Sequence, residues 1–190
     1  MPKGVIDKTV EKGIEPKSEV SIIFSGPFQY DQTERVALRA MTQVLQERLR
    51  ESIREELGGT YSITVRPDMQ KLPNPEFSIT VQFSGDPKRM SDLIQRVYQE
   101  IDRFKAGGAA PEQARDVREG LLREFETSST QNGYLLGQIV GRYRLGEDPA
   151  TLWQVPEFYR KVDAAAIQRA AKTYLDSANR IQVTLMPESK

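Results

Sequence analysis

The chain has 190 residues, of which 38% are hydrophobic, and its 27 Lys and Arg residues balance 27 Asp and Glu residues. A chain of this length can bury roughly 70% of its unfolded surface in a single domain. Its zero net charge gives no field that would attract nucleic acid or an anionic membrane, which disfavours both partners. No stretch approaches the length of a membrane span, so we expect no transmembrane helix.

Two missing residue types exclude several kinds of catalysis. The sequence contains no histidine and no cysteine. Disulfides and thiolate chemistry are therefore excluded, and a Ser-His-Asp triad would lack its base. Protein zinc sites rely on histidine and cysteine ligands, whereas carboxylates alone suit hard cations. We therefore expect no catalytic zinc, and no cofactor, on this chain.

The N-terminal part of the chain contains a weak pattern followed by a clear one. Residues 1–18 alternate charged side chains with isolated apolar ones, which indicates an extended lead-in or linker. From residue 20 apolar and smaller residues alternate, which predicts a strand that Gly26 and Pro27 end. We therefore expect one domain over residues 19–190, preceded by the lead-in at residues 1–18.

A long helix is predicted next, from Val36 to Leu57. Asp31 followed by Glu34 is typical of a capping box at a helix start. Apolar residues then recur along one helical face, at Leu38, Met41, Leu45, Leu49 and Ile53.

The period changes at Gly58 and Gly59. Tyr61 begins an alternating pattern that predicts a strand over residues 60–66. Glycine adopts the left-handed conformation that commonly ends a helix, so the chain can reverse here and bring Arg54 near Tyr61. Spacing alone favours the simpler interpretation, in which Arg54 is a solvated cation at a helix end and Tyr61 an ordinary strand aromatic.

The remaining elements follow from similar patterns. A proline-rich loop of about ten residues should join the strand at 60–66 to another at 77–83, as an antiparallel hairpin. Helices are predicted after Asp86, after Pro111, over 153–162 and over 163–175, and a last strand at 181–185. Gly133, Gly137 and Gly141 recur every four residues, which predicts a helix whose glycine face another helix approaches closely. A membrane-embedded GxxxG pair is disfavoured by the charged neighbours.

This order of elements predicts an α+β two-layer sandwich, with a mostly antiparallel sheet and helices packed on one face. The segment R-E-E-L-G-G-T-Y, which holds Arg54 and Tyr61, resembles the arginine and tyrosine element of the inverzincin zinc peptidases. The family includes pitrilysin, insulin-degrading enzyme and mitochondrial processing peptidase, and the bacterial members are the most similar. Further matching segments extend the resemblance over most of the chain, at residues 24–28, 132–136, 146–149 and 180–185.

The resemblance implies a C-terminal, non-metal domain of a zinc metallopeptidase, inactive alone. The zinc would lie on a partner domain or subunit, bound by an H-x-x-E-H motif that this chain lacks. Arg54 and Tyr61 would bind the peptide substrate and stabilise the oxyanion from across a chamber. The resemblance also implies a periplasmic or cell-envelope location. Two alternatives remain open: a non-enzymatic scaffold of the same fold, as in respiratory-complex core subunits, and an unrelated α+β interaction module.

Overall fold

The computed structural model describes residues 3–57 and 62–188, except for the side chains of residues 54–57. One five-stranded sheet lies within these residues, in the spatial order β1-β5-β2-β4-β3. Its strands are β1 (Val5–Glu11), β2 (Ser18–Pro27), β3 (Ile63–Gln70), β4 (Glu76–Gly85) and β5 (Arg180–Met186). The strands β1 and β5 are parallel, and the other neighbouring pairs are antiparallel.

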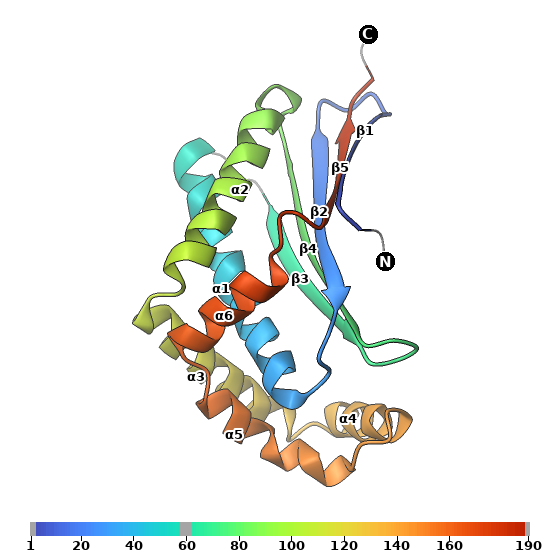
Figure 1. The fold of residues 1–190 in the computed structure, drawn as a ribbon, viewed down its shortest axis with the longest axis vertical. Helices are drawn as coiled ribbons and strands as arrows, with labels where there is room; N and C mark the ends of the chain where they lie inside the picture. The colour runs from blue at the N-terminus through green and yellow to red at the C-terminus, as the bar shows by residue number, and fades with distance from the viewer. Residues whose placement is uncertain (1–2, 58–61, 189–190) are drawn as a thin grey trace.

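The helices lie together on one face of this sheet (Figure 1). They are α1 (Gln32–Leu57), α2 (Met90–Gly107), α3 (Pro111–Ser128), α4 (Asn132–Arg144), α5 (Val155–Arg160) and α6 (Ala164–Tyr174), with short 3₁₀ turns at Pro87–Arg89 and Pro149–Gln154. The helices α3, α4 and α5 gather near the N-terminal end of α1, at the bottom of Figure 1. The predicted α+β sandwich with a mostly antiparallel sheet is thus confirmed.

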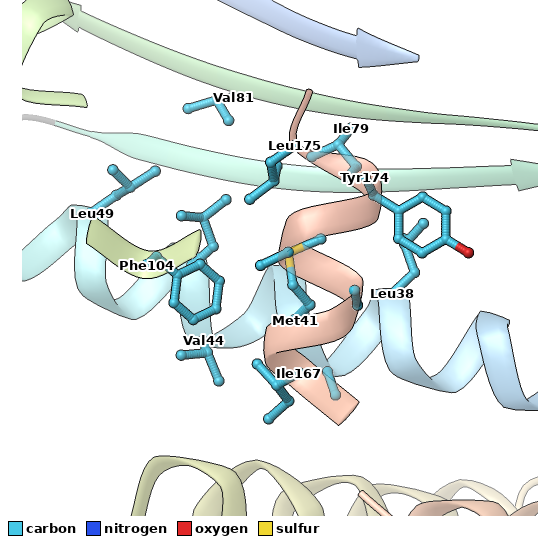
Figure 2. Close-up of a cluster of buried hydrophobic side chains, with 14 of the residues drawn as sticks. Leu38, Met41, Val44, Leu49, Ile79, Val81, Phe104, Ile167, Tyr174 and Leu175 are labelled. Carbon is cyan, nitrogen blue, oxygen red and sulfur yellow. The ribbon is translucent and has the colours of Figure 1, made fainter. Parts of the chain in front are cut away.

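The core lies between the sheet and the helices α1, α2 and α6. Alternation in β2 buries Val20, Ile22 and Phe24, and these residues pair with Phe83, Val81 and Ile79 of β4. Figure 2 shows aliphatic side chains of α1 meeting side chains from β4, α2 and α6, among them Leu38, Met41, Val44, Ile79, Phe104 and Ile167. The helical period of 3.6 residues and the strand period of two, both visible in the sequence, therefore place the apolar residues of α1 and of the strands in one shared core.

Aspartate side chains cap the starts of several helical segments. Asp31 accepts a hydrogen bond from the Glu34 backbone N–H at 2.8 Å, before α1. Asp86 and Asp163 accept similar bonds at 2.9 and 2.7 Å, before the Pro87–Arg89 turn and α6. Each cap satisfies a backbone donor that the first helical turn leaves without a partner, which explains why these starts are visible in the sequence.

Two strand predictions differ from the structure. Residues 5–11, within the expected lead-in, form the edge strand β1, which pairs with β5. The strand expected over 60–66 continues as β3 to Gln70, so the hairpin connection shortens to residues 71–75. Pro67 lies inside β3, opposite Ile79 of β4. A proline is tolerated there because β3 is an edge strand and pairs on one side only.

The predicted close approach of a helix to the glycine face of α4 is wrong. Among the described residues, a Cβ atom placed on Gly133, Gly137 or Gly141 would meet no atom within 4 Å other than the backbone of its own helix. Several apolar side chains of the same helix are also exposed, namely Leu136, Ile139, Val140 and Tyr143. Among the described residues, no helix is long and apolar enough to cross a membrane.

Candidate functional site

The predicted site lies where α1 ends and β3 begins. Arg54 belongs to the last turn of α1, but its side chain is outside the described residues, and so is Tyr61. Their expected proximity therefore stays a prediction. We call residues 54–62 the junction. The structure describes both of its flanks, which are residues 46–53 of α1 with the neighbouring part of α2, and the start of β3. These flanks determine how firmly the two candidate residues can be held.

Gln46 joins α1 to the first residues of β3. Its Nε2 atom donates a hydrogen bond to the Ile63 carbonyl at 2.6 Å, and its Oε1 atom accepts one from the Val65 N–H at 2.5 Å. Both backbone groups lie on the edge of β3 that faces away from β4. One side chain thus takes the place of a missing neighbouring strand and fixes the start of β3 against the helix.

Two further contacts fix the same part of α1 against α2. The Arg48 guanidinium donates to Glu100 Oε1 at 2.7 Å and to the Gly108 carbonyl at 2.8 Å. One turn later, Ser52 accepts a hydrogen bond from Arg96 Nε at 2.7 Å. Glu100 and Ser52 are both buried, so these bonds form in surroundings where an unpaired polar group would be costly. The end of α1 that carries Arg54 is therefore anchored on two sides.

These side chains surround an open depression of about 530 Å³ next to the junction. Arg48, Arg96 and Arg103 line it together with Glu51 and Glu100. The lining offers permanent charges and hydrogen-bond donors, which can hold a peptide but cannot generate a nucleophile. This cluster could not be predicted from the sequence, because nothing in the spacing of α1 and α2 shows which of their arginines meet.

The donor set of this chain does not fit zinc. The sequence supplies no histidine and no cysteine, and zinc sites depend on those ligands. Among the side chains that the structure describes, which exclude those of residues 54–61, no group of three or more carboxylates is placed to hold a metal ion. Histidine or cysteine ligands for zinc would have to come from outside the printed sequence.

Comparison with known proteins identifies the family. The family model described as the peptidase M16 inactive domain matches residues 2–121, which is more than half of the chain and includes the junction. The chain therefore belongs to the inactive-domain family of the M16 zinc proteases, and the resemblance inferred from its sequence is confirmed.

Two curated relatives share the name probable zinc protease PqqL. The Haemophilus influenzae protein is 27% identical over 110 residues, which cover 58% of this chain and 11% of the relative. The Escherichia coli protein is 22% identical over 169 residues, covering 88% of this chain and 18% of the relative. The crystal structure of the periplasmic protease PqqL from E. coli matches with a TM-score of 0.86 and 22% identity, over 98% of this chain and 21% of that one. The chain thus spans less than a fifth of the length of the curated relatives.

Proposed function

We propose that this domain assists a zinc-bearing domain or subunit of the same family in cleaving peptides, by supplying Arg54 and Tyr61 to the substrate. The observation that carries the proposal is the family match across the junction, where an arginine in the last turn of α1 precedes a tyrosine by seven positions. The two side chains would bind the scissile carbonyl and the oxyanion that develops from it.

The chemistry of the two residues suits this role. A guanidinium offers five N–H donors and a permanent charge, and a phenol adds one more donor. The C-terminal end of a helix carries a partial negative charge, which favours an arginine in its last turn. Oxyanion stabilisation is strongest when the donors are held in place before the reaction. The contacts of Gln46, Arg48 and Ser52 support the proposal because they hold both flanks of the junction.

The zinc-dependent part of the reaction lies outside this chain in our proposal. The PqqL relatives are zinc proteases by name, and activation of water by zinc needs the histidine ligands that this chain lacks. We further propose a location in the cell envelope, which is supported by the periplasmic protease PqqL of E. coli.

The test is steady-state peptide cleavage by the complete, zinc-loaded protein carrying Arg54→Ala or Tyr61→Phe. Loss of one oxyanion donor should lower kcat by about 100- to 1,000-fold, with a smaller change in KM, because the interaction is strongest in the transition state. The double variant should lose less than the product of the two effects, since both donors serve one site. Arg50→Ala is the matched control, because Arg50 is exposed one turn earlier on α1.

The outcome also separates this role from a scaffold role. If Arg54→Ala keeps kcat within about threefold of the parent while folding normally, the change in barrier is below about 1 kcal/mol and the proposed role is wrong. The domain would then serve as a structural scaffold of the same fold.

A further inference from the structure

A second polar site lies near the opposite end of α1. A cavity of about 200 Å³ opens between the first turns of α1, the end of β3 and the helices α3, α4 and α5. Its lining combines cationic side chains, Arg35, Arg39 and Arg142, with aromatic and aliphatic ones, chiefly Phe125, Tyr134 and Tyr159. None of these residues belongs to the junction that carries Arg54.

The charges in the lining do not balance. Three guanidinium groups face a single carboxylate, that of Glu124 at the cavity rim. Glu147 approaches Arg35 at 3.7 Å from outside the lining, but it also approaches the Lys71 ammonium group at 3.8 Å. Arginine keeps its charge at all accessible pH values. The cavity is therefore positively charged at neutral pH.

Part of the hydrogen-bonding capacity of these arginines is unused. Arg35 Nε is buried and has no partner in the part of the chain that the structure describes. Arg142 is only 7% exposed and bonds Gln138 and Thr151 through Nη1 and Nε. Buried donors in native proteins nearly always have partners, so an unused one calls for an explanation. The buried Nε therefore adds only to the positive field of the cavity, whereas a ligand would bond to the guanidinium groups that line it.

Arg39 already shows how this cavity binds a carboxylate. Its Nη2 atom donates to both carboxylate oxygens of Glu124, at 2.6 and 2.7 Å. Tyr159 lies behind it, with its hydroxyl 3.3 Å from Arg39 Nη1. Tyr134 keeps its hydroxyl proton at neutral pH, as tyrosine ordinarily does, and burial raises its pKa further, so the hydroxyl is a donor. Donors thus outnumber acceptors around the cavity.

We propose that this cavity binds a carboxylate that carries an apolar group, as the free C-terminus of a peptide does. The carboxylate fits the arginines, and the apolar group fits the rings of Phe125 and Tyr159 and the neighbouring Val36 and Val155. One water molecule occupies about 30 Å³ in the liquid. The cavity volume is several times larger, so the cavity can hold more than a carboxylate group alone. A small, strongly hydrated anion would leave the apolar walls without a partner.

This inference is independent of the proposed peptidase role, since it requires neither zinc nor Arg54. The test is calorimetric titration of the 190-residue chain with four probes: N-acetyl-Ala-Ala-Phe, its C-terminal amide, 3-phenylpropionate and inorganic phosphate. The free acid should bind at least about tenfold more tightly than the amide, because the amide removes the charge-assisted hydrogen bonds. Equal binding of the acid and the amide, or tighter binding of phosphate than of either acid, would overturn the proposal. The 3-phenylpropionate result shows whether a small acid suffices or a peptide is needed.

Two substitutions should change the affinity in opposite directions. Arg39→Gln should weaken binding of the free acid by about tenfold or more, because it removes a charged donor. Glu124→Gln should tighten it, because Arg39 loses its competing carboxylate. Both side chains are partly exposed, at 36% and 54%, so both variants should fold. The matched controls are Arg123→Gln and Glu119→Gln, an exposed pair on α3 at 3.5 Å, which should leave affinity unchanged. If the Arg123 and Glu119 variants changed the affinity for the free acid as much as the Arg39 and Glu124 variants, the proposal would be overturned.

Discussion

At the scale of single residues, Gln46 shows how one side chain can stabilise the start of a strand. The side chain comes from the middle of α1 and bonds the backbone of Ile63 and Val65, 17 and 19 positions further along the chain. Both bonds lie at a sheet edge, where backbone groups otherwise depend on water. The position of the start of β3 against α1 therefore depends on this contact.

Replacing Gln46 with alanine should destabilise the protein. We expect the free energy of unfolding to fall by about 1 to 3 kcal/mol, because two part-buried backbone groups lose their partner. The measurement is urea unfolding, with Gln95→Ala on the exposed side of α2 as the control. A loss below about 0.5 kcal/mol, the usual range for surface substitutions, would show that the contact contributes little.

The residues of the candidate site were predictable only in part. Arg54 and Tyr61 come from a local motif, which a sequence displays directly. The contacts of Gln46, Arg48 and Arg96 join residues 17 to 60 positions apart, and such pairings follow from packing. The same limit hid the cavity near the start of α1, whose arginines come from α1 and α4.

At the scale of elements, glycine has opposite roles in two helices. Gly137 lies inside α4, and a Cβ atom there would meet nothing within 4 Å. Gly108 follows the last turn of α2 at a φ of +73°, and a Cβ atom there would lie 3.1 Å from Cβ of Gln168. Gly137 therefore lowers the stability of α4, whereas Gly108 permits a backbone conformation that other residues avoid.

Alanine substitution at these two positions should therefore change stability in opposite directions. Gly137→Ala should raise the free energy of unfolding by about 0.5 to 1 kcal/mol, because alanine loses less backbone entropy in a helix. Gly108→Ala should lower it by about 1 to 3 kcal/mol through backbone strain. Thermal melts of the two variants give the comparison. A lower melting temperature for Gly137→Ala would show that a neighbour does cover the glycine face of α4.

The helix starts with aspartate caps were predicted, whereas two strand limits, those of β1 and β3, were not, for a physical reason. A helix start depends on residues within one turn, such as Asp31 and the backbone N–H of Glu34. A strand extends as far as its neighbour pairs with it. Strand β4 supplies partners for β3 up to Gln70, and β5 supplies them for β1 from Val5. Neither partner can be read from the strand's own sequence.

At the scale of the whole molecule, the order of elements was enough to predict the two layers. Each helix has an apolar stripe and each half-buried strand has an apolar face. These surfaces must be buried against each other, which leaves few possible arrangements of helices and sheet. The position of β1 beside β5 was not predictable, because β1 is largely exposed and carries little apolar pattern. Strands that contribute least to the core are thus the hardest to place.

The buried tyrosines should make the stability of the whole molecule sensitive to alkaline pH. Burial raises the pKa of Tyr98, Tyr134, Tyr159 and Tyr174 above the usual value of 10.0. The shift is largest for Tyr174, which also donates a hydrogen bond to the Glu34 carboxylate. Above pH 10 the unfolded chain therefore releases protons that the folded chain still holds. Because the unfolded state then binds fewer protons, the free energy of unfolding must fall as pH rises.

We therefore expect the urea midpoint to be lower at pH 11 than at pH 9, and Tyr174→Phe to reduce that decrease. The comparison uses the difference between the two pH values, because the substitution also removes a hydrogen bond at both. Tyr143→Phe is the control, since Tyr143 is 70% exposed on α4; deprotonation of lysines affects all variants alike. An equal decrease in the parent and in Tyr174→Phe would mean that Tyr174 loses its proton as easily in the folded protein as in the unfolded chain.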